Sequence, residues 1–87
     1  MIAIIIPTAL QKLTGEQREV SAEGQTVGEV LAQLARRFPQ IRQHLFTPEG
    51  QLRHFVNLFV NEDLVTDLAR RLSPADEVMI VAALSGG

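Results

Sequence analysis

The last two residues of this sequence, Gly86 and Gly87, are the ones whose chemistry stands out. Glycine has no side chain and accepts many backbone angles, so a Gly-Gly tail can thread a narrow channel and place its carboxylate beside bound ATP. A carboxylate is a poor electrophile, but adenylation would make AMP a leaving group that a sulfur donor can displace to form a thiocarboxylate. This chemistry needs no catalytic side chain in the chain itself. The alternative is a terminus without function, since termini are usually disordered.

The ionisable side chains show no recognisable catalytic or metal-binding pattern. His44 and His54 do not have a local metal-ligand spacing, and no serine or threonine nucleophile is identifiable beside them. Glu62-Asp63 is interpreted as a solvated turn, because two adjacent carboxylates do not make a coordination shell. The absence of cysteine excludes disulfides, thiolate nucleophiles and cysteine-ligated metals. We therefore expect a protein that is not itself an enzyme and that binds no metal and no cofactor stably.

Composition narrows the possible partners. The net charge is -2 and the basic residues are scattered, so the electrostatic footprint of a nucleic-acid binder is missing. The apolar stretch 1–6 stops at Pro7, lacks a basic n-region and is far too short to span a membrane, so it predicts a buried strand. We expect neither a nucleic acid nor a membrane as partner, and a cytoplasmic location.

The order of predicted elements indicates an α+β fold in one domain of 87 residues. Strands are predicted at 2–6, 17–22, 55–60, 64–65 and 77–84, with the last strand beside the first in the middle of the sheet. They predict a mixed sheet of four to five strands with one main helix packed on one face. The domain is expected to cover residues 1–84, followed by a flexible tail at 85–87.

The main helix carries the clearest local signal. Thr26 precedes the apolar pattern and Glu29 follows three residues later, which is typical of a capping box. Apolar residues at helical spacing then form one stripe: Val27, Val30, Leu31, Leu34, Ala35 and Phe38. Pro39 is expected to end this helix.

Three further segments connect the predicted strands and the main helix. A turn is predicted at 11–15, an irregular connection at 40–54, and one helical turn around Leu68 and Leu72. Within the connection, Ile41, Leu45 and Phe46 are expected to pack against the core.

One helix covers only one face of a sheet, yet the strands are apolar on both faces. If Val56, Leu58 and Val60 face the helix, Phe55 and Phe59 face away from it. In the last strand, either Val78, Ile80 and Ala82 or Met79, Val81 and Ala83 must also face away. An exposed apolar patch usually marks a protein interface, which we expect to include Phe55, Phe59 and Leu84. The alternative is that connection 40–54 folds over this face.

The sequence resembles the MoaD/ThiS-type sulfur carriers of the ubiquitin-like (β-grasp) fold. The resemblance extends over nearly the whole chain and is strongest in four segments: Ile6-Pro7-Thr8 with Leu10 and Thr14-Gly15, Thr26 to Leu31, Arg53 to Asn61, and Asp76 through Gly86-Gly87. It implies that the Gly87 carboxylate is adenylated and then thiocarboxylated, with Ser85 and Gly86 as the tail that delivers it.

The resemblance also implies three kinds of partner. They are an E1-like adenylating enzyme that uses ATP, a sulfur donor such as a rhodanese or cysteine desulfurase, and an acceptor enzyme. The acceptor would be the large subunit of molybdopterin synthase or a PLP-dependent cysteine synthase. The Pro7-Thr8 start and the segment 52–61 look most like cysteine-pathway carriers and unassigned relatives of the molybdopterin synthase small subunit.

Two alternatives remain open at the level of sequence. The chain could be a thiamine-pathway carrier, although these carriers are shorter. It could also be a protein modifier conjugated through Gly87 to lysines, for which its own single lysine, Lys12, argues only mildly against polymeric chains.

Overall fold

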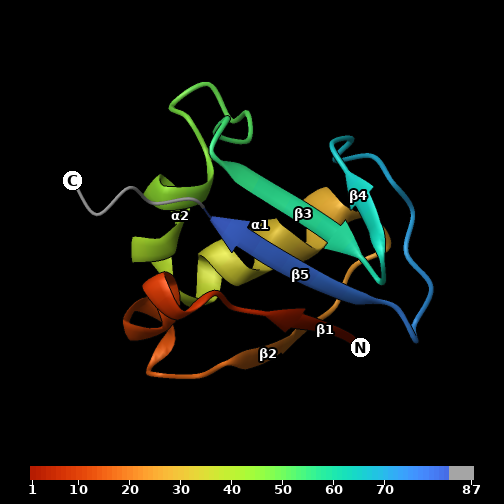
Figure 1. The fold of residues 1–87 in the computed structure, drawn as a ribbon, viewed down its shortest axis with the longest axis horizontal. Coiled ribbons are helices and arrows are strands. Elements are labelled where there is room, and N and C mark those ends of the chain that lie inside the picture. The colour runs from red at the N-terminus through yellow and green to blue at the C-terminus, as the bar shows by residue number, and fades with distance from the viewer. Residues whose placement is uncertain (83–87) are drawn as a thin grey trace.

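The computed structural model describes residues 1–82 and arranges five strands in one mixed sheet. In chain order the elements are β1 (Ile2–Ile5), the 3-10 helix η1 (Thr8–Thr14), β2 (Glu19–Ala22), α1 (Val27–Arg37), α2 (Pro39–Leu45), β3 (Val56–Val60), β4 (Asp63–Val65) and β5 (Glu77–Ala82). The spatial order is β2-β1-β5-β3-β4, so the last strand along the chain lies in the centre (Figure 1). β5 is parallel to β1 and antiparallel to β3, which confirms the predicted α+β fold and its central strand pair.

Helix α1 begins as the capping pattern predicted. The Thr26 hydroxyl accepts a hydrogen bond from the Glu29 backbone N–H at 3.2 Å, and the Glu29 carboxylate accepts one from the Gln25 N–H at 2.9 Å. These contacts satisfy backbone donors that have no partner within the helix. The helix ends at Arg37, with Phe38 as its C-cap and Pro39 next, as expected.

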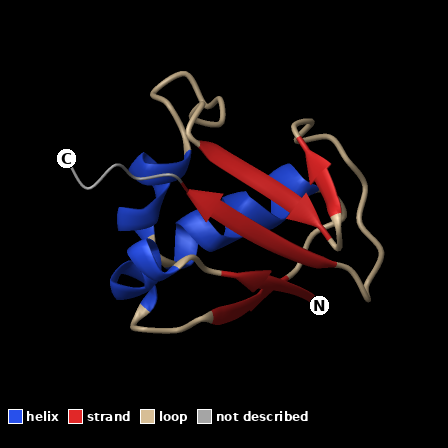
Figure 2. Cartoon of the chain, viewed as in Figure 1, coloured by secondary structure: helices blue, strands red, loops and turns tan. Residues whose placement is uncertain are grey.

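The core lies between α1 and the sheet face that α1 covers. Leu31 and Leu34 of α1 are fully buried, as are Leu58 of β3 and Val78 of β5. In Figure 2 the helices lie behind the sheet and at one of its ends, so α1 crosses a single face. The predicted division of β3 is confirmed, because Val56, Leu58 and Val60 are all buried on the helix side.

Two predicted connections are helical instead. Residues 11–14 of the expected turn at 11–15 belong to η1, which spans Thr8–Thr14 and buries Leu10 and Thr14; Gly15 then turns the chain with a φ of 67°. Residues 40–45 of the expected irregular connection belong to α2, which has Pro39 in its first turn. Proline has a φ suited to the start of a helix, so Pro39 both ends α1 and begins α2.

The helical turn expected around Leu68 and Leu72 is absent from the structure of that segment. Residues 66–72 instead run as a strap past the start of α1. The Gly28 N–H donates to the Leu68 carbonyl at 2.8 Å, and the Val27 N–H donates to the Arg70 carbonyl at 3.0 Å. The prediction of a helical turn was wrong: the strap has one isolated turn, in which the Arg70 N–H donates to the Asp67 carbonyl at 3.1 Å, and the carbonyls of Leu68 and Arg70 bond free N–H groups at the start of α1.

The predicted domain boundary and the predicted C-terminal tail remain predictions. β5 is described as far as Ala82, so the expected boundary at 84 and the flexible tail at 85–87 lie outside the described residues. Within residues 1–82, no helix is long and apolar enough to cross a membrane.

Candidate functional site

The candidate site is the sheet face that α1 does not cover. Strand alternation and register assign its members, which we call the open face: Glu19 and Ser21 of β2, Ala3 and Ile5 of β1, Glu77, Met79 and Val81 of β5, Asn57 and Phe59 of β3, and Leu64 of β4. The question left open by the sequence is therefore settled. Met79 and Val81 face away from the core, whereas Val78 and Ile80 face into it.

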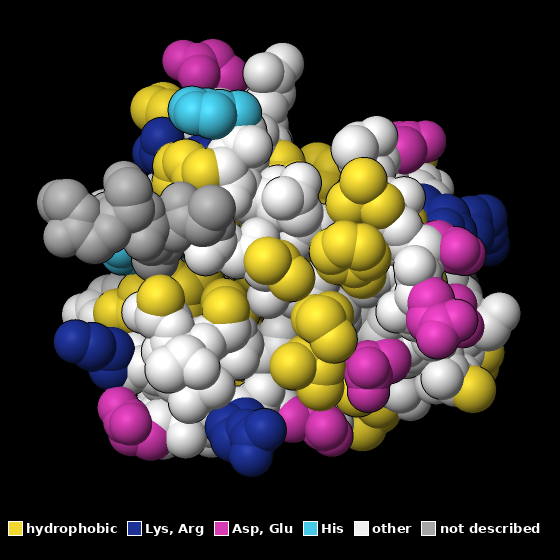
Figure 3. Space-filling view, viewed as in Figure 1, with side chains coloured by type: hydrophobic (Ala, Val, Ile, Leu, Met, Phe, Trp, Pro, Cys, Tyr) yellow, Lys and Arg dark blue, Asp and Glu magenta, His cyan; other side chains and the backbone are white. Residues whose placement is uncertain are grey.

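A continuous apolar line crosses the open face. Met79 is the register partner of Ile5 on one side and of Phe59 on the other, and Phe59 is the partner of Leu64. We call these four residues the central row. Ile5 and Phe59 are half-buried, while Met79 is 37% exposed and Leu64 is 59% exposed. Figure 3 looks onto this face and shows hydrophobic side chains gathered across its middle, with acidic side chains at one border.

The connection 40–54 leaves the open face uncovered. Its helix α2 packs against α1 and η1, and both Ile41 and Leu45 are fully buried there, as predicted. Phe46 is half-buried against the same core. The alternative in which this connection folds over Met79 and Val81 is therefore wrong, because both side chains retain more than a third of their exposure.

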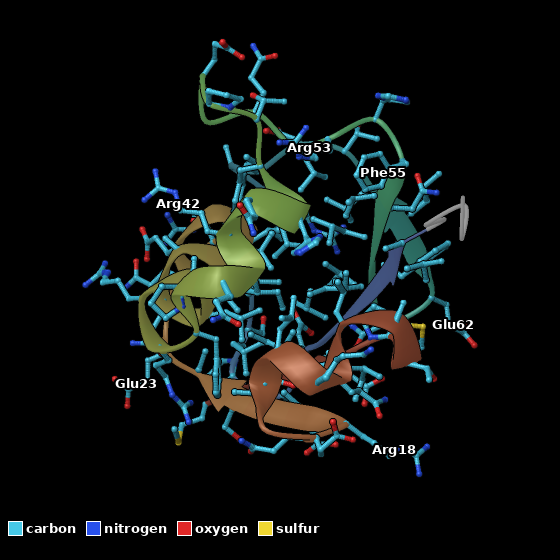
Figure 4. All side chains as sticks on the ribbon, turned by 90° about the vertical axis from the view of Figure 1, so that its left-hand side faces the viewer. Arg18, Glu23, Arg42, Arg53, Phe55 and Glu62 are labelled. Atoms are coloured by element: carbon cyan, nitrogen blue, oxygen red, sulfur yellow. The ribbon has the colours of Figure 1, made fainter. Side chains whose placement is uncertain are left out.

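Phe55 and Phe59 have different environments. Phe55 precedes β3, packs against the buried core cluster and meets the His54 ring edge-on, with centroids 5.7 Å apart. Figure 4 labels Phe55 where the chain enters β3 from the loop that carries Arg53. Phe59 lies instead in the central row, between Met79 and Leu64. Phe59 thus lies within the exposed apolar row, and Phe55 lies at the border of the open face.

The described end of β5 lies beside this border. Ala82, the last described residue of β5, pairs with Val56, the residue that follows Phe55. The remaining predicted site residues, Leu84, Ser85, Gly86 and Gly87, lie outside the described residues.

The charged residues on the open face are acidic. Glu19 pairs in register with Ile5 of the central row, and Glu77 begins β5 beside Ala3. The start of β5 is held by Asn61, whose side-chain oxygen accepts from the Glu77 N–H at 3.2 Å and whose amide donates to Asp76 at 3.1 Å. A hydrogen bond from the Ser73 backbone N–H, followed by that from Asn61, lowers the pKa of the Asp76 carboxyl below its ordinary value.

The other polar candidates do not assemble into a reactive site. His54 is exposed beside Phe55, and His44 is half-buried in α2. Asp63 pairs loosely with Arg70 at 3.9 Å, and residues 1–82 contain no group of three or more His, Asp or Glu side chains arranged to hold a metal. The candidate site within residues 1–82 is therefore the exposed apolar row on the open face.

The sequence reasoning missed two members of the central row, Ile5 and Leu64. Their strands were predicted, but their positions beside Met79 and Phe59 depend on register. A usable signal was the predicted pairing of the last strand with the first, which brings an apolar residue of the first strand beside an apolar residue of the last.

A five-stranded mixed sheet crossed by one main helix is the ubiquitin-like β-grasp fold. The chain belongs to the ThiS family, whose profile matches residues 4–87. This confirms the resemblance to the MoaD/ThiS-type sulfur carriers.

Three relatives are similar over nearly the whole chain. The sulfur carrier protein CysO of Mycobacterium tuberculosis is 37% identical, covering 99% of this chain and 98% of its own. A chain of the Amycolatopsis orientalis BexX/CysO complex superposes with a TM-score of 0.89 at 31% identity, covering 100% of both chains. SAMP1 of Haloferax volcanii has a TM-score of 0.83 at 25% identity, covering 99% of this chain and 98% of its own.

Proposed function

We propose that this protein is a sulfur carrier for cysteine biosynthesis, and that Gly87 supplies the carboxylate that carries the sulfur. The observation that carries the proposal is the 37% identity to the sulfur carrier CysO over 99% of this chain. The family match extends through residue 87 and so includes the Gly86-Gly87 pair.

The proposed chemistry takes place at the chain end, in the active sites of partner enzymes. A Gly87 carboxylate oxygen attacks the α-phosphorus of ATP, which forms an acyl adenylate and releases pyrophosphate. Hydrosulfide that displaces AMP leaves a thiocarboxylate directly. A persulfide that displaces AMP leaves an acyl disulfide, and a second thiol must then cleave it, which releases the thiocarboxylate and forms a disulfide between the two thiols. An E1-like adenylating enzyme would catalyse the first step and a rhodanese or cysteine desulfurase would supply the sulfur. The exposed apolar row on the open face supports this division of labour, because a carrier that is modified by other enzymes needs a surface on which they can bind it.

The open face would hold the carrier on these enzymes while the tail reaches into them. Five residues follow Ala82, and a fully extended chain of that length spans at most about 18 Å. A partner seated on the central row would thus have its active site within that distance of the end of β5. The acceptor proposed for the cysteine route is a PLP-dependent synthase. The large subunit of molybdopterin synthase is the alternative acceptor.

Intact-mass analysis after incubation with the adenylating enzyme, ATP and a sulfur source tests the proposal. The wild-type chain should exchange one oxygen for sulfur and become alkylated by iodoacetamide at its C-terminal peptide. A variant lacking Gly87 should remain unmodified, while Glu49→Gln, on the exposed loop after α2, should react like wild type. Unchanged mass in the wild-type chain with all plausible adenylating enzymes would contradict the proposal.

A second candidate is a protein modifier conjugated through Gly87 to lysines. The likeness to SAMP1, a small archaeal modifier protein, favours it. Both candidates require carboxyl activation and differ only in the final nucleophile. Immunoblots of cells that express the tagged protein distinguish them: a modifier gives a ladder of higher-mass adducts that resist reducing agents, and a dedicated sulfur carrier gives none.

A further inference from the structure

This protein has only two sulfur-containing side chains. The sequence has no cysteine and two methionines, Met1 and Met79. Met1 precedes the sheet and is 73% exposed, whereas Met79 lies in the central strand and is 37% exposed. A thioether can be oxidised to a sulfoxide without a neighbouring thiol, so exposure decides which methionines react.

Met79 occupies the middle of the open face. Its register partners are Ile5 and Phe59, and the next residue outward on each side is Glu19 or Leu64. A methionine side chain is unbranched, polarisable and adaptable, which suits it to the centre of an apolar contact surface. The same position exposes its sulfur to oxidants whenever no partner covers the face.

We propose that Met79 is a site of reversible oxidation that controls docking on the open face. This inference depends on the proposed function, because it assumes that the central row contacts the partner enzymes. A peroxide transfers one oxygen atom to Sδ of Met79: the O–O bond breaks, the S–O bond forms, and water is the other product for hydrogen peroxide. Methionine sulfoxide reductases restore the thioether while a dithiol becomes a disulfide and the oxygen leaves as water.

The sulfoxide should weaken docking without unfolding the protein. Its oxygen is a hydrogen-bond acceptor, and an apolar partner surface would bury it without a donor. The cost of such an unsatisfied group corresponds to docking that is about 5- to 150-fold weaker. The fold should tolerate the change because Met79 points away from the core, into which its neighbours Val78 and Ile80 are buried at 0% and 1% exposure.

The experiment measures thiocarboxylate formation by the adenylating enzyme at subsaturating carrier, which reports kcat/KM. Wild type and Met79→Leu are each assayed before hydrogen peroxide treatment, after it, and after repair by methionine sulfoxide reductases with dithiothreitol. Each protein is compared with its own untreated sample, and Met1 serves as the internal control because both proteins contain it. Peptide mapping must locate the added oxygen, since sulfur-for-oxygen exchange adds nearly the same mass.

We expect kcat/KM of the oxidised wild type to fall at least fivefold and to recover after repair, while the ratio for Met79→Leu stays near one. Circular dichroism should show the oxidised protein still folded. Equal loss in both proteins, or full activity with Met79 quantitatively oxidised, would overturn the inference and leave the sulfur-carrier proposal intact. Untreated wild type that forms no thiocarboxylate would overturn the proposed function, and this inference with it.

Discussion

Replacing Phe59 with aspartate separates docking from folding. A phenylalanine buries about 150–250 Å² when fully covered, so Phe59, which is at most about a third exposed, still offers up to about 70 Å² to a partner. At about 25 cal/mol per Å² this area contributes up to about 1.7 kcal/mol to docking, or roughly 20-fold in Kd. The carboxylate of Phe59→Asp adds a desolvation cost, so we expect binding to the adenylating enzyme at least about 10-fold weaker by isothermal titration calorimetry.

The fold should survive this substitution. Phe59 has cross-strand contacts with Met79 and Leu64, and such pairs contribute about 0.2–1 kcal/mol each. A chain of 87 residues has a stability of about 4–13 kcal/mol, so Phe59→Asp should still unfold cooperatively in urea.

The matched control is Leu58→Asp, one residue away and fully buried on the opposite face. Burying an unpaired carboxylate costs several kcal/mol in addition to the lost leucine packing, so this variant should be unfolded or close to it. Unfolding of Phe59→Asp would place Phe59 in the core. Normal affinity of a folded Phe59→Asp would show that the partner docks elsewhere.

Three further substitutions test the scaffold. Leu34→Ala, at a fully buried position of α1, should lower the free energy of unfolding by about 2–5 kcal/mol in urea titrations, and a loss below 1 kcal/mol would show that the site collapses or is not core. Thr26→Ala removes the cap on the Glu29 N–H and should cost about 0.5–2 kcal/mol by the same measurement, whereas no loss would mean that water replaces the hydroxyl. Asp76 has a lowered pKa in the folded state, so its contribution is present above its unfolded pKa and is lost as pH falls through the lowered value. Asp76→Asn should therefore be less stable than wild type at neutral pH, with a gap that narrows below about pH 4; a gap independent of pH would contradict this charge-based account.

The elements that the sequence predicted well have signals contained within a few residues. The start of α1 could be predicted because Thr26 and Glu29 bond the adjacent backbone, and nothing distant is required. The two faces of β3 followed from alternation alone, since Leu58 and Phe59 must point in opposite directions in any strand. The central pairing of the first and last strands followed from the apolar character of both, which suits the centre of a sheet.

The wrong predictions concern segments whose local sequence pattern is compatible with two different structures. Proline stops a helix and also begins one, so Pro39 gave no warning of α2. Leu68 and Leu72 have helical spacing, but the carbonyl of Leu68 bonds the start of α1 at 2.8 Å. That contact joins segments forty residues apart, and local pattern carries no information about it. The role proposed for Gly86-Gly87 comes from the sequence and the family alone, because these two residues lie outside the described residues.

Phe55 and Phe59 have different neighbours in the structure, and these neighbours are the reason why Phe59 is the residue proposed to contact a partner. Alternation assigns both rings to the same side of β3, so from sequence they are equivalent. In the structure Phe55 packs on the core and against His54, whereas Phe59 has Met79 and Leu64 as neighbours, both more than a third exposed. Truncating Phe55 would remove core packing, and any loss of partner binding would be confounded with loss of stability. At Phe59 the loss of partner binding can be measured separately from the loss of stability, because its strand neighbours Met79 and Leu64 lie on the open face and outside the core.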